Sequence, residues 1–114
     1  MKKVGLVLTR EKALQIAVQA RQALTVIYGS RLREVYLFGS CARGRPRGDA
    51  DIDIAVILDH VSSLFAEHEK TSQLGSELSL RENCLVSFVF ANESDFRNGK
   101  YFLHRNIQKE GVPV

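Results

Sequence analysis

Residues 35–58 have the sequence VYLFGSCARGRPRGDADIDIAVIL, which contains the strongest strand and loop signals of the chain. Its first four residues are apolar and are followed at once by glycine, which predicts a short buried strand. In 51–58 the aliphatic residues at 52, 54, 56 and 58 alternate with Asp51, Asp53, Ala55 and Ile57, which predicts a second strand carrying both aspartates on one face. Glycines at 39, 44 and 48 and a proline at 46 predict a loop between the two strands.

Helical patterns flank this strand–loop–strand unit on both sides. Thr9 is a candidate N-cap for a helix whose apolar residues recur at helical spacing as far as Tyr28, before Gly29-Ser30 ends it. Segment 84–90 predicts a third strand, and 96–110 predicts a helical region that ends at Gly111 and Pro113. Between the second and third strands we expect a helix capped by Ser62 or Ser63, with an apolar stripe made of Val61, Leu64, Phe65, His68, Ser72, Gly75 and Leu78.

This order of elements predicts a single domain over residues 1–114 with an α+β fold, in which a small mixed β-sheet carries helices mainly on one face. The apolar share of 45% and the charged share of 25% exclude the disordered and fibrous classes. A net charge of +3 is too small to indicate binding to a long nucleic acid. Because no apolar run approaches the roughly 20 residues of a membrane-spanning helix, no membrane partner is expected.

Two observations bear on the cellular compartment. Cys41 and Cys84 have neither metal-ligand nor redox spacing, so we expect free thiols in a reducing environment. Residues 1–12 lack the long apolar region and the small-residue cleavage site of a secretory signal. The sequence therefore predicts a cytoplasmic protein.

Asp51 and Asp53 are candidate catalytic and metal-binding residues. Two carboxylates at positions i and i+2 of a strand point the same way, so they lie side by side on one face. Holding two like charges together is costly unless a cation lies between them. Mg²⁺ fits such a pair, because it is usually held by one or two carboxylates together with substrate phosphates and water.

The segment that follows the first strand suits a phosphate group. Gly39 lets the backbone approach an anion closely, and Ser40 adds a hydroxyl donor. Arg43 follows three residues later and can reach phosphate oxygens, while Gly44 lets the loop fold back toward the acidic strand. The alternative reading is a solvated loop beside an ordinary strand end. The four residues together favour a nucleoside triphosphate held between these donors and the metal.

Three matching segments resemble the nucleotidyltransferase superfamily: Leu37-Phe38-Gly39-Ser40, Ala42-Arg43-Gly44 and Ala50-Asp51-Ile52-Asp53-Ile54. The spacing Gly-Ser-x10-Asp-x-Asp looks like that of its minimal, MNT-type branch, whose members are paired with HEPN-domain proteins in toxin–antitoxin operons. The resemblance implies a polymerase β-like fold, with Gly39 and Ser40 at the phosphates and Asp51 and Asp53 on Mg²⁺. It also implies transfer of a nucleoside monophosphate, usually AMP from ATP, to a hydroxyl group.

One departure from the family pattern leaves alternatives open. The family commonly carries a third carboxylate on the next core strand, where Ser87 stands at the matching position. Serine is a poor magnesium ligand and no base at neutral pH, so catalysis is less secure than nucleotide binding. Three functions therefore stay open: an antitoxin that adenylylates a HEPN-type helical partner protein, a module that neutralises this partner by contact, and a small-molecule nucleotidyltransferase. Because the chain is short, we also expect the domain to function within a complex or as a homo-oligomer.

Overall fold

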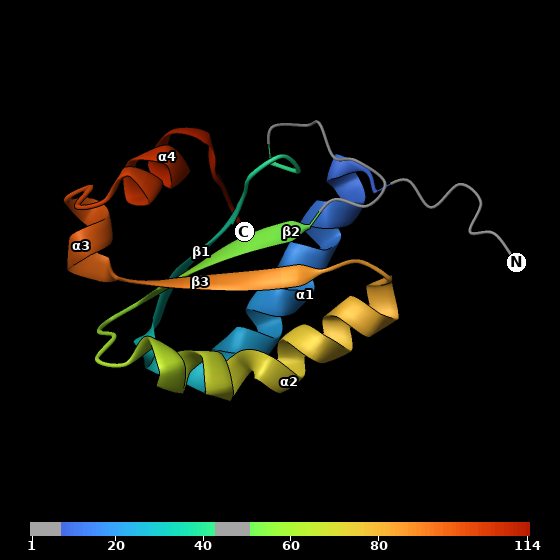
Figure 1. Cartoon of the computed structure of the whole chain (residues 1–114), viewed down its shortest axis with the longest axis horizontal. Helices are drawn as coiled ribbons and strands as arrows, with labels where there is room; N and C mark the ends of the chain where they lie inside the picture. Colours follow the sequence, from blue (N-terminus) through green and yellow to red (C-terminus); the bar gives the residue numbers. More distant parts are fainter. Residues whose placement is uncertain (1–7, 43–50) are drawn as a thin grey trace, which may run out of the picture.

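The computed structural model describes residues 8–42 and 51–114, which form a four-stranded sheet with helices on both faces (Figure 1). In chain order the elements are α1 (Arg10–Tyr28), the 3-10 turn η1 (Gly29–Arg31), β1 (Leu32–Phe38), β2 (Ile52–Leu58), α2 (Leu64–Glu82), β3 (Val86–Asn92), α3 (Glu93–Arg97), α4 (Phe102–Glu110) and β4 (Val112–Pro113).

The sheet has the order β3-β2-β1-β4 and is mixed. β1 pairs antiparallel with β2, with Phe38 opposite Asp53 at the loop end of the pair. β2 pairs parallel with β3, and β4 pairs antiparallel with the outer side of β1. The predicted α+β class with a small mixed sheet is confirmed. In this order β3 lies at one edge of the sheet, beside the strand that carries Asp53.

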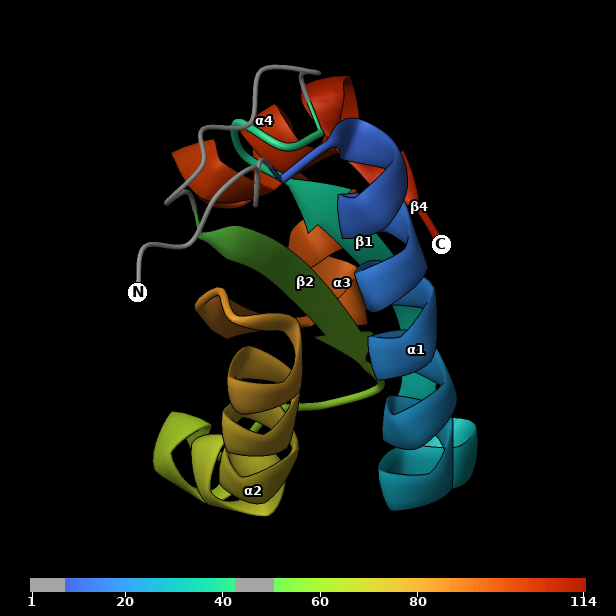
Figure 2. The same cartoon turned by 90° about the vertical axis from the view of Figure 1, so that its right-hand side faces the viewer.

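The two long helices cover one face of the sheet (Figure 2). α1 begins at the predicted cap, where the Thr9 hydroxyl accepts a hydrogen bond of 3.1 Å from the backbone N–H of Lys12. The main core lies between these helices and the sheet. It is formed by the buried side chains of α1, alternate residues of β1, the even-numbered residues of β2 and the residues of β3 that face α2. Burial of this apolar surface is the main force that holds the sheet against α1 and α2.

The other face of the sheet carries a smaller core under the short helices. Phe96 of α3 and Ile107 of α4 pack against Ala55 and Ile57 of β2, with Tyr36 at their side. α3 and α4 therefore lie opposite α1 and α2 across the sheet (Figure 2). Because successive residues of a strand point to opposite faces, Asp53 shares this second face with Ala55 and Ile57.

The predicted apolar stripe of α2 is wrong at its first turns. Leu64 and Phe65 are 57% and 73% exposed, and His68 lies on the exposed side with its ring edge-on to Phe90. The buried face contains Glu67 and Thr71 as well as Leu78, so it follows a different line along the helix. Apolar spacing alone does not predict the buried face of such a helix, because it assigns a charged residue such as Glu67 to the solvent-exposed side.

Three smaller boundaries also differ from the expectation. The C-terminal helical region is divided into α3 and α4 around Gly99, which has a φ of +61°. Val112 and Pro113 form a short edge strand after α4, a position that tolerates proline because the missing N–H faces away from the sheet. The third strand spans Val86–Asn92, two residues later than predicted. No helix within the described ranges is long and apolar enough to cross a bilayer.

Candidate active site

Gly39 and Asp53 meet where β1 ends and β2 begins. Gly39 has a φ of +81°, a conformation that favours glycine. A Cβ atom built on Gly39 would lie 2.6 Å from Oδ2 of Asp53, closer than such atoms approach one another. Glycine is therefore needed at position 39 for two reasons: its backbone has a positive φ, and the Asp53 carboxylate leaves no room for a Cβ atom. The structure brings together the glycine of the Gly-Ser pair and an aspartate fourteen positions later.

Asp51 and Asp53 form an unneutralised acidic pair among the described residues. Asp53 is half-buried and Asp51, just before β2, is exposed. Burial, and then the negative charge of Asp51, raise the pKa of the Asp53 carboxyl, and no described basic side chain lowers it. A half-buried carboxylate beside a second one is the donor set that a hard divalent cation neutralises. The residues present therefore fit Mg²⁺.

The turn after Gly39 is hydrogen-bonded to the segment that carries Asp51 and Asp53. Cys41 is buried, and its Sγ–H donates a hydrogen bond of 3.6 Å to the backbone carbonyl of Asp51. Burial, followed by the charge of Asp53, raises the pKa of the Cys41 thiol, which therefore stays protonated at neutral pH and is not a nucleophile. Cys41 acts as a packed link between the turn and the segment before β2.

Arg10 is a site neighbour that the sequence does not reveal. Its Nε donates a hydrogen bond of 3.3 Å to the backbone carbonyl of Ala42, in the same turn. The contact joins the first residue of α1 to a position 32 residues later. No spacing rule links the two, because the contact depends on how α1 packs across the sheet. A positive charge is thereby held beside the turn that is predicted to receive phosphates.

The structure places some predicted site residues and does not describe others. Gly39, Asp51 and Asp53 converge at the loop end of β1 and β2, and Ser40 lies half-buried in the adjoining turn. The predicted phosphate ligands Arg43 and Gly44 lie outside the described residues. The roles assigned to all six residues stay predictions.

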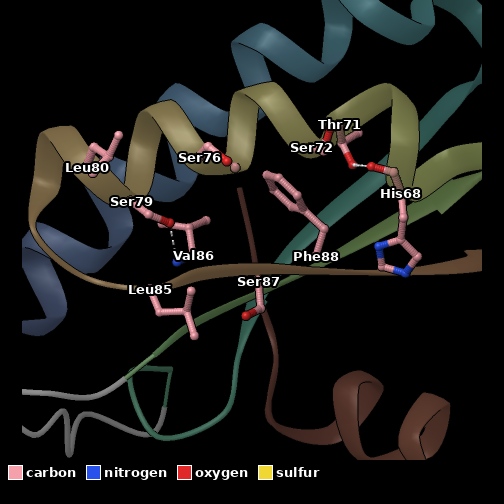
Figure 3. Close-up of a pocket in the computed structure, with 11 residues that line it drawn as sticks. His68, Thr71, Ser72, Ser76, Ser79, Leu80, Leu85, Val86, Ser87 and Phe88 are labelled. Carbon is pink, nitrogen blue, oxygen red and sulfur yellow. Dashed lines mark hydrogen bonds between the residues drawn. The ribbon is translucent and has the colours of Figure 1, made fainter.

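Ser87 lies directly beside Asp53, in register across the parallel β2–β3 pair. Its side chain points away from α2, whereas Val86 and Phe88 point toward that helix (Figure 3). Ser87 and Asp53 therefore share one face of the sheet. Residues 8–42 and 51–114 contain no group of three or more His, Cys, Asp or Glu side chains that could hold a metal ion. Within these ranges the acidic site consists of two carboxylates, with a hydroxyl at the third position.

Residues 11–114 match the family model described as "Polymerase beta, Nucleotidyltransferase". The chain belongs to this family. The match begins in α1 and reaches the last residue, so it includes the whole sheet of the nucleotidyltransferase domain.

Relatives of this nucleotidyltransferase domain are found among known proteins and solved structures. A "Putative protein adenylyltransferase" from Methanocaldococcus jannaschii is 28% identical over 105 residues, which cover 91% of this chain and 96% of the relative. A crystal structure of a "putative nucleotidyltransferase" from Sulfolobus solfataricus aligns with a TM-score of 0.64 and 21% identity, over 91% of this chain and 80% of that one. At 21% identity, this similarity shows a shared fold and nothing more.

A third similar structure is a toxin–antitoxin crystallised with AMP-PNP. It aligns with a TM-score of 0.61 and 25% identity, over 83% of this nucleotidyltransferase chain and 69% of that chain. AMP-PNP is an analogue of ATP in which nitrogen replaces the oxygen between the β- and γ-phosphorus atoms. The structural neighbour therefore combines the same fold with a nucleoside triphosphate analogue.

Proposed function

We propose that this domain transfers AMP from ATP to a hydroxyl group of a HEPN-type partner protein, as the antitoxin of a toxin–antitoxin pair. The close approach of Gly39 to Asp53 carries the proposal, because it sets the turn that is predicted to bind phosphate against a carboxylate. The adenylyltransferase name of the archaeal relative and the AMP-PNP in the toxin–antitoxin structure support the choice of ATP. Both relatives cover most of this chain, which supports the same use of the fold.

Each proposed site residue has a separate task. Asp51 and Asp53 would hold Mg²⁺, which when bound neutralises charge on the phosphates. Gly39 leaves room for the β- and γ-phosphates beside the backbone, and the Ser40 hydroxyl donates to their oxygens. Arg43 would pair with the same oxygens, and Gly44 would let the loop close over them. Neither Arg43 nor Gly44 lies within the described ranges, so their roles rest on the sequence.

The proposed reaction is a substitution at the α-phosphorus. The acceptor hydroxyl oxygen forms a new bond to the α-phosphorus, and the bond from that phosphorus to the bridging oxygen of the β-phosphate breaks. Pyrophosphate leaves with the bonding electrons, and the hydroxyl proton passes to a base. Ser87 cannot take this proton at neutral pH, because a serine hydroxyl is not basic. The base must therefore come from the acidic pair, the partner or water.

The position of Ser87 favours a second candidate function. Its register beside Asp53 leaves a hydroxyl where a carboxylate would complete the acidic cluster. Loss of a general base typically lowers a rate by about 10²–10⁴-fold. In this version the domain still binds nucleotide and neutralises the HEPN-type partner by contact, without modifying it.

The proposal includes a cytoplasmic location. It is supported by the choice of ATP as substrate and by the two cysteines, both of which are free thiols in the structure.

The test combines the purified chain, Mg²⁺, each of the four NTPs in turn and the protein product of the adjacent gene, which we expect to be of HEPN type. Intact-mass spectrometry should show the partner heavier by one AMP when ATP is present. Asp51→Asn and Asp53→Asn should abolish this gain. Asp59→Asn is the matched control, because Asp59 lies just past the opposite end of β2 and pairs with Arg31. A stable complex with an unmodified partner would instead establish the contact mechanism.

A further inference from the structure

The outer edge of β3 has backbone groups that no described residue satisfies. The backbone N–H of Ile52 donates to the carbonyl of Leu85, so the odd-numbered residues of β3 direct their backbone groups toward β2. Residues 86, 88 and 90 therefore direct theirs outward. The N–H of Val86 is bound by the Ser79 hydroxyl of α2 at 3.0 Å (Figure 3). For Phe88 and Phe90, no other described residue supplies a partner to the outward N–H and C=O groups.

This edge lacks the features that usually prevent strand addition. Native edge strands are protected by charged side chains, proline, bulges or a covering element. β3 reads VSFVFAN and contains neither a charge nor a proline. Its pairing with β2 runs without a register shift from Val86 to Asn92. The strand is therefore regular, uncharged and open along its outer side in the described part of the chain.

A groove of about 630 Å³ lies between this edge and α2. On the α2 side small residues keep the groove open, among them Gly75, where an added Cβ would lie 3.5 Å from the Phe88 ring. At one end stand the apolar side chains of Leu80 and Leu85, which are 84% and 55% exposed. The volume suits the side chains of a bound segment, since ligand pockets span about 300–1,000 Å³.

The groove borders the strand that lies next to the proposed active site. Ser87 is one of its lining residues and stands in register with Asp53. A strand added along β3 would lie about 4.8 Å from it, and its alternate residues would point to the two faces of the sheet. One set would enter the groove beside α2. The other would lie on the face shared by Ser87 and Asp53, where an acceptor hydroxyl is needed.

We infer that an extended, uncharged segment of the HEPN-type partner pairs with the outer edge of β3, inserts apolar side chains into the α2–β3 groove and presents its acceptor hydroxyl beside Ser87. The inference rests on the proposed function for the identity of the partner. The occupant is an extended segment because only another strand offers donors and acceptors that match the spacing of the Phe88 and Phe90 backbone groups. The neutral groove lining adds a preference for apolar side chains.

The first test fills the groove. Ser76→Trp adds a large ring at an exposed α2 position that lines the groove, and Gln73→Trp adds the same ring at an exposed α2 position that does not. Calorimetry should show that Ser76→Trp weakens binding to the purified HEPN-type protein by about tenfold or more, while Gln73→Trp matches the wild type. Both variants should bind Mg·ATP as the wild type does.

The second test addresses the backbone. Phe90→Pro removes the ring and the outward N–H while leaving the β2–β3 hydrogen bonds in place, whereas Phe90→Ala removes the ring alone. Partner affinity should fall about fivefold further for proline than for alanine, the effect of one lost hydrogen bond. Thermal unfolding of both variants verifies that the sheet is intact.

Several outcomes overturn the inference. Equal partner affinity of Ser76→Trp and Gln73→Trp would exclude the groove, and equal affinity of the two Phe90 variants would exclude strand pairing. A wild-type dimer in the absence of partner that Ser76→Trp converts to monomers would assign the edge to a second copy of this chain. Lack of any complex between the wild type and the HEPN-type protein also overturns it. Binding without AMP transfer refutes only the enzymatic part of the proposed function.

Discussion

Ser87 lies in register beside Asp53 across the parallel pair of β2 and β3, so a hydroxyl is the third member of an otherwise acidic group. Adjacent strands are about 4.8 Å apart, which sets a side chain at position 87 close to the carboxylate of Asp53. The substitution of this single residue therefore tests whether the chain lacks a base.

We expect Ser87→Asp to raise the kcat of AMP transfer by about 10²-fold, because the new carboxylate can accept the hydroxyl proton. Initial rates with saturating Mg·ATP and the partner protein provide the measurement. Ser87→Asn is the matched control, since its amide is similar in size and does not act as a base. An unchanged kcat in Ser87→Asp would mean that the wild type already obtains its base elsewhere.

A second prediction concerns the contact between Gly39 and Asp53. Gly39→Ala should abolish detectable Mg·ATP binding in calorimetry, because the added Cβ would lie 2.6 Å from Oδ2 of Asp53 and displace the carboxylate. Gly29→Ala is the control, since Gly29 also has a positive φ of +57° but has nothing within 4 Å of the added atom. Both variants should lose about 1–3 kcal/mol of stability through backbone strain. Equal Mg·ATP affinity in the two would contradict the proposed site.

The strand–loop–strand unit could be predicted because its signals are local. The alternation in 51–58 and the glycine at 39 specify where β1 ends, where β2 begins and that both aspartates lie at the loop end of this strand pair. Side-chain alternation follows directly from strand geometry, so it depends little on the rest of the fold. The close approach of Gly39 to Asp53 is the spatial consequence of that pattern.

The features that the sequence did not reveal all depend on distant partners. Glu67 is buried on α2 only because Tyr28 and Arg31 supply its hydrogen bonds. The contact of Arg10 with Ala42 requires α1 to be packed across the sheet. The open edge of β3 follows from the strand order, and a chain with the same local patterns could place another strand there.

A third prediction concerns stability and pH. The pKa of Asp53 is raised in the folded protein, first by burial and then by Asp51, so folding favours the protonated form. The folded state binds more protons than the unfolded state, and stability is therefore lost as the pH rises from the ordinary value, about 3.9, through the raised one. Asp53→Asn should have a higher Tm than the wild type at pH 7, without nucleotide, and this advantage should vanish below about pH 4. A lower Tm for Asp53→Asn at pH 7 would refute the electrostatic cost.

A fourth prediction treats Arg10 as a positioning residue for the turn after Gly39. Arg10→Met keeps much of the side-chain length but removes the hydrogen bond to the Ala42 carbonyl. We expect the KM for ATP to rise about 2–10-fold, the range of one net hydrogen bond, with kcat unchanged. Arg21→Met, at an exposed position farther along α1, should leave both constants unaltered. A fall in kcat at constant KM would assign Arg10 a role in the reaction itself.

The last prediction concerns Glu67, which is 3% exposed and accepts hydrogen bonds from Tyr28 at 2.9 Å and Arg31 at 3.0 Å. Burial alone would raise the pKa of this carboxyl, but the hydrogen bonds from Arg31 and Tyr28 hold it below its ordinary value. A depressed folded pKa contributes stability above the unfolded value, and this contribution is lost as the pH falls through the folded one.

Glu67→Ala should therefore lower the free energy of unfolding at pH 7 by about 2–4 kcal/mol, because it leaves the Tyr28 hydroxyl and part of the Arg31 guanidinium without hydrogen-bond partners. Urea unfolding provides the measurement, with Glu69→Ala at an exposed site of α2 as the control. Glu67→Gln should lose less, since its amide oxygen still accepts one of the two hydrogen bonds. The difference in unfolding free energy between the wild type and Glu67→Ala should become smaller below about pH 4. A difference that stays constant with pH would mean that the charge of Glu67 contributes nothing to stability and that packing alone explains the loss.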